Sequence, residues 1–308
     1  MLVKGQAHPV LLAAATKMEQ FLETYLPLAG HASQPDSPYE TEQQAGLPRS
    51  KMPGVNESVL HHTRHAAQWK TWAGLDCVEG LMSCIHQVKS LVAVYPLSRT
   101  AIEGFAGAAW LLEPGIGAQV RAYRGLLDHE RSLKAQLDTL RLRQQGYILL
   151  HGDPADAYSE AKALLASRLS CLRHDLESVR RRLPDPDDPE EYPTFTTIVD
   201  GALDDATEEG VGKGAYSELC NLVHPGTDAM SQLFNSGSTN EFLNISVRLW
   251  VVPMLTTCYA MRHCLMRRSV YYSLPSPEQH LESVLDALHA AGNLPQDTLL
   301  LEPPSEPV

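Results

Sequence analysis

The chain has 308 residues, which is enough for one large domain or two small ones. Apolar side chains make up 44% of it, so the chain can bury a substantial core and is not disordered throughout. It carries 25 basic and 37 acidic residues, a formal net charge of −12. A surface that is basic throughout, as in proteins that coat nucleic acids, is therefore excluded, although a local basic face is not.

No stretch of the sequence resembles a membrane span or a signal peptide. The uncharged run between Arg248 and Arg262 is too short to cross a bilayer. The N-terminal segment reaches Lys17 and Glu19 early, so we interpret it as an amphipathic helix. The six cysteines include no Cys-x-x-Cys pair, and most of them lie in apolar helical segments. We expect reduced thiols in a cytoplasmic protein that does not contact a membrane.

The sequence predicts an all-α fold. Apolar residues recur at i, i+3, i+4 and i+7 over long segments, and alternating β-branched runs are nearly absent. In chain order we expect an N-terminal helix within 1–29, a flexible linker or loop over 30–55, a multi-helix bundle domain over 56–292 and a loose tail over 293–308.

The first part of the bundle domain is predicted from helix starts and stops. Asn56 can cap a helix that runs with interruptions to Val94. Pro96 should break this helix, and Ser98 can cap the next one, which Pro114–Gly115 ends.

A long antiparallel helical hairpin is expected over 116–183. The turn His-Gly-Asp-Pro separates its two amphipathic helices, and an acidic, Pro-rich break over 184–193 follows. A shorter helix is expected near 196–209 and a last one near 276–292. Between them, a helix over 239–272 is apolar around much of its circumference, which favours two-fold association of two chains.

Positive charge is concentrated in this hairpin. Residues 119–183 contain 12 Lys/Arg against 8 Asp/Glu, a local net charge of +4 in a chain of net charge −12. A solvated amphipathic hairpin is one interpretation, and an arm that follows phosphates is the other. The candidate phosphate-binding residues are Arg121, Arg124, Arg131, Arg141, Arg143, Arg173 and Arg180–Arg182.

Two polar groups stand out in an apolar, small-residue segment. Arg99 and Glu103 are four residues apart, so they share one face of a helix. Gly104 and Gly107 allow another helix to approach closely, which would partly bury the Glu103 carboxylate. The pair is either a structural ion pair that fixes the helix register or one half of a polar active site.

A second polar group follows far downstream in the sequence Tyr-Ser-Glu-Leu-Cys-Asn-Leu-Val-His-Pro-Gly. Ser217, Asn221 and His224 lie on one helical face, and Pro225–Gly226 ends the helix just after the histidine. The imidazole would then lie at a helix C-terminus, beside groups that suit acid–base or phosphate chemistry. The alternative is a core histidine that caps the last carbonyl groups.

These segments resemble a group of uncharacterised, mostly actinobacterial helical proteins, which share an Arg-x-x-x-Glu helix, a Trp-Leu-Leu-Glu/Asp-Pro helix end and a Tyr-x-x-Leu-Ser/Cys-x-x-x-His-Pro/Gly segment. That group is in turn distantly similar to HEPN-type helical bundles, which include RNases and nucleotide-binding proteins. The resemblance implies that Arg99, Glu103, Tyr216 and His224 face one another, with His224 at the place of the HEPN catalytic histidine. The Arg-x4–6-His pattern of HEPN RNases is not preserved, so Arg99 would have to supply the cation.

A third group could bind a metal ion. Glu57, His61 and His65 form a helical stripe at intervals of four, with His62 adjacent. Glu103 or His86 could complete the ligand set, but no second ligand pair is visible. A polar, solvated helix face is the alternative, and we expect neither a metal nor a cofactor.

We therefore expect an RNA-directed enzyme, with tRNA as the substrate that suits it best. His224 would act as acid and base, Arg99 would hold a phosphate or carboxylate, and Tyr216 and Asn221 would orient the substrate. Such an enzyme would be RNase-like, or a transferase that uses an aminoacyl-tRNA as acyl donor in small-molecule biosynthesis.

Two other functions remain open. The first is a small-molecule enzyme that uses the same polar pocket without RNA. The second is a catalytically silent helical interaction module of a defence or toxin–antitoxin system, in which the acidic body of this chain would bind a basic partner.

Overall fold

The structure is a computed structural model that describes residues 7–29, 33–87, 93–151, 155–205, 214–217, 219–220 and 247–294. It divides into two compact units where a single bundle domain was expected over 56–292. Unit 1 contains the described residues within 1–37, 69–112 and 194–308, and unit 2 those within 38–68 and 113–193. Each unit is described by itself.

The expected all-α fold is confirmed. Every named element of the described residues is a helix, and Arg49 and Ser58 form an isolated β-bridge. No described helix is both long enough and apolar enough to span a membrane. The helices whose bounds the structure describes are α1 (Pro9–Ala29), α2 (Pro38–Gln43), α3 (Leu60–Gln87), α4 (Val94–Leu111), α5 (Ala118–His151), α6 (Ala155–Arg180), α7 (Phe195–Asp204), α10 (Val247–Tyr272) and α11 (Glu278–Gly292).

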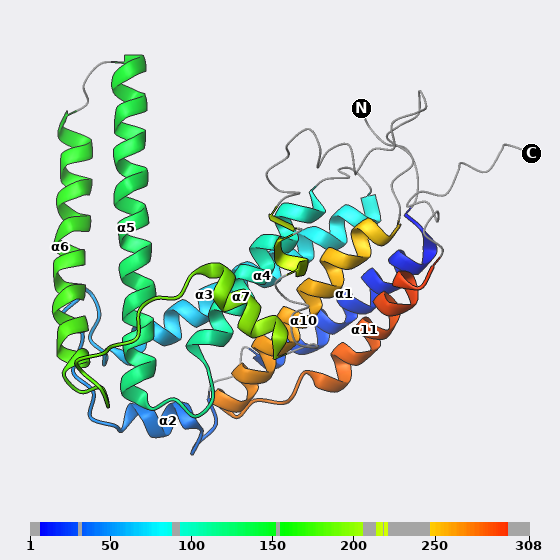
Figure 1. Ribbon diagram of the computed structural model, residues 1–308, viewed down its shortest axis with the longest axis horizontal. Coiled ribbons are helices and arrows are strands. Elements are labelled where there is room, and N and C mark those ends of the chain that lie inside the picture. The colour runs from blue at the N-terminus through cyan, green and yellow to red at the C-terminus, as the bar shows by residue number, and fades with distance from the viewer. Residues whose placement is uncertain are drawn as a thin grey trace, which may run out of the picture. The chain divides into compact units, whose positions relative to one another are not determined.

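Helix α10 lies at the centre of unit 1. It packs against α4, α7 and α11, and α1 packs against α11 (Figure 1). The side chains of Trp250, Met261 and Leu265 are fully buried on α10. Much of its apolar circumference therefore packs against neighbours within the same chain.

Glycines bring α3 and α4 into close contact within unit 1. A Cβ atom added to Gly104 on α4 would lie 2.7 Å from the carbonyl oxygen of Lys70 on α3. A Cβ atom on Gly74 would lie 2.7 Å from the ring of Phe105. Only glycine allows this backbone approach, so the close approach expected at Gly104 is confirmed, and it places α4 firmly against α3.

The expected antiparallel hairpin is confirmed in unit 2, where α5 and α6 lie side by side (Figure 1). Their shared core contains Leu126 and Leu133 from α5 and Leu169 and Leu172 from α6. Both helices continue beyond this core toward the turn between them.

Residues 33–55, which are part of the segment expected to be a flexible linker or loop, are anchored to the rest of the structure. They include α2, whose Tyr39 is buried, and Met52 belongs to the hydrophobic core of unit 2. Backbone groups are also tied down, because Lys51 N–H donates to the carboxylate of Asp175. The anchoring of this segment thus combines a few apolar contacts with hydrogen bonds to its backbone.

Two predicted helix boundaries differ in the structure. Helix α3 begins at Leu60 and not at Asn56, and α4 begins at Val94. Pro96 is thus the third residue of α4, where its missing N–H breaks no intrahelical hydrogen bond. Ser98 is consequently a buried residue inside the helix and not its cap.

Candidate functional site

Three side chains of unit 1 form one hydrogen-bonded cluster, which we call the Arg99–Glu103–Tyr216 cluster. Arg99 Nε donates to Glu103 Oε1 at 2.9 Å, one turn along α4. Tyr216, from the helical residues 214–217, donates its hydroxyl to the same oxygen at 2.6 Å. The structure therefore brings together three of the four residues that the resemblance implied to face one another.

The cluster is only partly shielded from solvent. The side chains of Arg99 and Glu103 are 26% and 25% exposed, whereas Tyr216 is buried. The hydrogen bond to Glu103 raises the pKa of the Arg99 guanidinium. Burial and the hydrogen bond to Glu103 raise the pKa of the Tyr216 phenol well above its usual value. Near neutral pH the phenol is thus protonated and serves as a donor.

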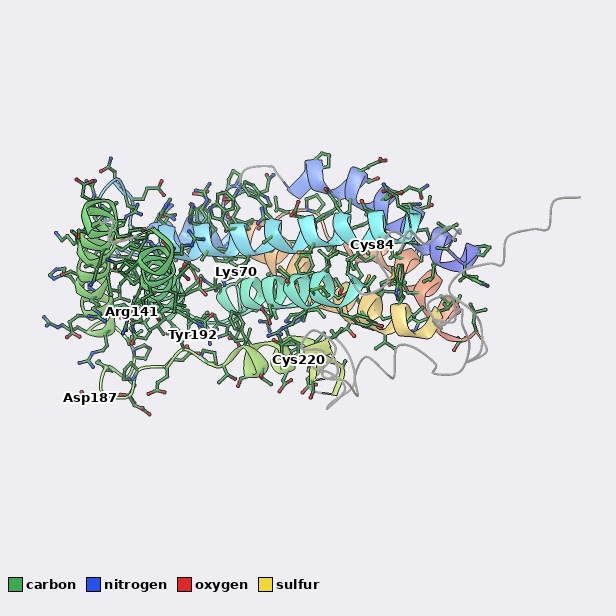
Figure 2. The ribbon with its side chains drawn as sticks, turned by 90° about the horizontal axis from the view of Figure 1, so that it is seen from above. Lys70, Cys84, Arg141, Asp187, Tyr192 and Cys220 are labelled. Atoms are coloured by element: carbon green, nitrogen blue, oxygen red, sulfur yellow. The ribbon has the colours of Figure 1, made fainter. Side chains whose placement is uncertain are left out.

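The Glu103 carboxylate is occupied at one oxygen only. Oε1 accepts both hydrogen bonds, and Oε2 makes none within the described part of the chain. The thiol of Cys220 (labelled in Figure 2) follows one turn after Tyr216 and lies near enough to affect the pKa values of Arg99 and Tyr216. A fixed carboxylate oxygen beside a cation and a phenol can accept a proton or bind a hydroxyl or amine of a ligand.

The rest of the downstream segment is only partly described. Ser217 is exposed and makes no contact with this cluster that the structure records. Asn221 and His224 lie outside the described residues. The close approach of α3 and α4 at Gly104 fixes the part of α4 that carries Glu103.

Two of the predicted phosphate-binding arginines are committed to contacts inside unit 2. Arg121 is 2% exposed, binds the Glu42 carboxylate and donates to the backbone carbonyl groups of Glu113 and Ile116. Arg124 is also buried. It binds two carboxylates, those of Glu113 and Glu190. Buried and neutralised cations of this kind hold loops in place and are not available to a phosphate backbone.

The outer cations of the hairpin are exposed. The guanidinium of Arg131 lies 4.7 Å from the ring centroid of Tyr192, whose hydroxyl donates to Asp128. Arg141 and Arg143 are exposed on α5 and form no ion pair within the described residues (Figure 2 labels Arg141). Arg173 binds Glu130.

Two grooves run between α5 and α6 beyond the core. One has a volume of about 540 Å³, and Arg141 and Lys162 line it from opposite helices, together with Asp138 and Gln144. The other has a volume of about 420 Å³ and contains Arg143. Cations from both helices can therefore reach one ligand.

The stripe of Glu57, His61 and His65, considered above as a metal site, makes contacts among its own side chains. Glu57 and His61 form a hydrogen bond of 2.9 Å, and the rings of His61 and His65 stack at 5.6 Å. Among the described residues, no three His, Cys, Asp or Glu side chains are arranged to hold a metal ion. The arrangement of the described residues therefore gives no support to Glu57, His61 and His65 as metal ligands.

A buried polar relay in unit 2 was not expected from the sequence. Asp175 accepts from the Ser50 hydroxyl at 2.8 Å, so the neighbouring His62 must donate through Nε2 to Ser50 Oγ at 2.9 Å. Nδ1 of His62 then accepts from Nδ1–H of His129 at 3.0 Å. Ser50, His62 and Asp175 are all buried. The hydrogen-bond directions run from His129 through His62 and Ser50 to Asp175.

Burial keeps both histidines of this relay uncharged. Burial, followed by the nearby imidazoles of His129, His61 and His65, lowers the pKa of His62 to about 3. Burial also lowers the pKa of His129, although Asp128 opposes the shift. No local signal marks this relay, because its members come from a loop and three separate helices.

Comparison with known proteins adds no assignment: no family model, curated protein or solved structure matches the chain. The class that the structure defines is therefore an all-α protein with a polar carboxylate cluster and a helical hairpin.

Proposed function

We propose that this protein is an RNA-directed enzyme whose reactive centre is the Arg99–Glu103–Tyr216 cluster. The observation that carries the proposal is the state of Glu103, which is fixed at Oε1 by Arg99 and Tyr216 and unoccupied at Oε2 within the described residues. An oriented carboxylate of this kind suits a general base, because it needs no rearrangement before it accepts a proton.

In the proposed reaction Glu103 accepts a proton from an attacking hydroxyl or amine. Arg99 pairs with the carboxylate and presents its guanidinium to a phosphate or carboxylate of the substrate. Tyr216 donates its phenolic hydrogen to Glu103 and fixes the rotamer of the carboxylate. His224, eight residues after Tyr216, returns a proton to the leaving oxygen.

The exposed cations of the hairpin support RNA as the substrate class. Arg141 and Lys162 line one groove from two helices, and Arg143 lines the other. Since Arg121 and Arg124 are neutralised internally, the proposed RNA-binding surface is smaller than the charge count of the hairpin indicates. tRNA is the proposed RNA, either as a molecule to be cut or as the carrier of an acyl group to be transferred.

The test uses a total tRNA preparation and the full-length protein. We expect a mobility shift whose affinity falls steeply between about 50 and 200 mM salt, because bound phosphates release counterions. The double substitution R141E/K162E should weaken binding at least about tenfold. The matched control is K17E, which reverses an exposed cation of unit 1 and should leave binding unchanged.

The reaction is tested with aminoacylated tRNA. Strand breaks on a denaturing gel indicate cleavage, and loss of the esterified amino acid from intact tRNA indicates acyl transfer. Binding that does not depend on salt, together with neither reaction, would overturn the proposal. Turnover of a small molecule without any tRNA binding would assign the same cluster to a small-molecule enzyme.

A second candidate function, a helical interaction module, has one specific observation in its favour. The leucines Leu142 and Leu164, one on each helix of the hairpin, are 66% and 58% exposed and would be available to contact such a partner. A protein that binds partners but neither binds tRNA nor turns over a substrate would fit this candidate.

A further inference from the structure

The outer half of the hairpin is a two-helix arm without a core of its own. We define this distal arm as residues 134–148 of α5 and 158–168 of α6. The last buried side chains before it are Leu133 and Leu169, and none of the described side chains within it is buried. Two helices by themselves bury only the faces that they turn toward each other, so a further helix pair is the usual way to cover such an arm.

One face of α6 carries a symmetric pattern in this arm. Glu160, Leu164 and Arg168 follow at i, i+4 and i+8, so they form one stripe along the helix. Leu164 is exposed, and neither charged side chain forms an ion pair within the described part of the chain. An acid and a base thus lie at equal distances on the two sides of an exposed leucine.

We infer that this stripe binds a second copy of the chain, with the two α6 helices antiparallel around a two-fold axis at Leu164. In that arrangement Leu164 packs against its own counterpart. Glu160 of each copy then lies opposite Arg168 of the other, because both are four residues from the axis. A two-fold interface must be self-complementary in this way. The inference goes beyond the proposed function and is independent of it.

The charges of the stripe favour an antiparallel second copy of the chain over a parallel copy or an RNA backbone. A parallel pair would place Glu160 opposite Glu160 and Arg168 opposite Arg168, which is unfavourable. An RNA backbone would meet a carboxylate at one end of the stripe and an apolar side chain at its centre, whereas RNA-binding faces are enriched in cations. The cations of the groove lined by Arg141 and Lys162 are not part of this stripe and stay available for RNA.

The experiment is a charge exchange followed by sedimentation equilibrium of the full-length protein. We expect a dimer for the natural sequence. E160R and R168E should each weaken it by about tenfold or more, because each places two like-charged pairs across the interface. The double variant E160R/R168E should dimerise again, and an equimolar mixture of the two single variants should form heterodimers.

A second pair of variants tests the apolar contact. L164S removes an exposed side chain and should weaken the dimer with little change in the melting temperature, because Leu164 is 58% exposed in the single chain. V270S is the matched control, since Val270 of α10 is 55% exposed and lies outside the stripe. A natural sequence that stays monomeric, a double variant that fails to recover, or association that disappears after RNase treatment would overturn the inference.

Discussion

Tyr216 donates a hydrogen bond of 2.6 Å to Glu103, although 113 residues separate the two in the sequence. Arg99 reaches the same oxygen from the preceding turn of α4. Two donors on one oxygen fix the orientation of the carboxylate, and they leave its second oxygen for a ligand. This relationship makes Glu103 the residue whose removal tests the proposed chemistry most directly.

Replacing Glu103 with glutamine should abolish most of the turnover while it preserves binding. The amide has nearly the same shape as the carboxylate but cannot accept a proton, and loss of a general base lowers the rate by about 10² to 10⁴. The measurement is turnover of aminoacylated tRNA alongside tRNA affinity. Y216F keeps the carboxylate and should lose less turnover. Full turnover by E103Q would show that the cluster is only structural.

Local periodicity accounts for what the sequence could predict. The hairpin and the pairing of Arg99 with Glu103 depend on neighbours within one or two helical turns, so spacing alone indicates them. The contacts of Arg121 with Glu42 and of Arg124 with Glu190 join residues 79 and 66 positions apart, and no spacing rule finds them. These arginines therefore looked like free cations in the sequence.

The buried relay, which includes a histidine of the first turns of α3, could not be predicted from sequence spacing either. The helical spacing drew attention to His61 and His65, which lie on the more exposed face. His62, between them, points into the core and meets Ser50 and His129. Which of three nearby histidines is buried depends on the position of α5 and the loop around Ser50, and this is tertiary information.

Replacing Asp175 with alanine should destabilise unit 2 by about 2–4 kcal/mol. The substitution leaves the Ser50 hydroxyl and the Lys51 N–H without their acceptor in a buried place, and hydrogen bonds to a charged group are among the stronger ones. Urea unfolding measures the change in the free energy of unfolding. Asp187, which is exposed, is the matched control, and D187A should change stability by less than about 0.5 kcal/mol. Similar effects of D175A and D187A would show that the relay contributes no more to stability than an exposed aspartate does.

The two relay histidines should make stability depend on pH. The unfolded chain takes up a proton at each histidine below a pKa of about 6.5, whereas burial keeps His62 neutral down to a pKa of about 3. The unfolded state thus binds more protons in this range, and the free energy of unfolding falls as the pH falls. The slope is at most about 1.4 kcal/mol per pH unit for His62, and His129 adds to it in the same direction.

The measurement is urea unfolding between pH 6.5 and 5, which is above the usual titration range of carboxylates. H62Q keeps an N–H donor for Ser50 and does not titrate, so its slope should be smaller than that of the natural sequence. An equal slope in both proteins would show that His62 is accessible to protons in the folded state.

Two glycine-to-alanine substitutions should have opposite effects on stability. The Cβ atom of G104A would lie 2.7 Å from the Lys70 carbonyl oxygen, so α3 and α4 must separate, at a cost of about 1–3 kcal/mol. G146A adds its Cβ atom in open space on α5 and should stabilise the protein by about 0.5–1 kcal/mol, because alanine favours helix. Thermal unfolding measures both changes. Since Gly104 adjoins Glu103, G104A should also reduce turnover, whereas G146A should not. If G104A is destabilised but keeps its turnover, the close approach of α3 and α4 at Gly104 is not required for the chemistry of the Arg99–Glu103–Tyr216 cluster.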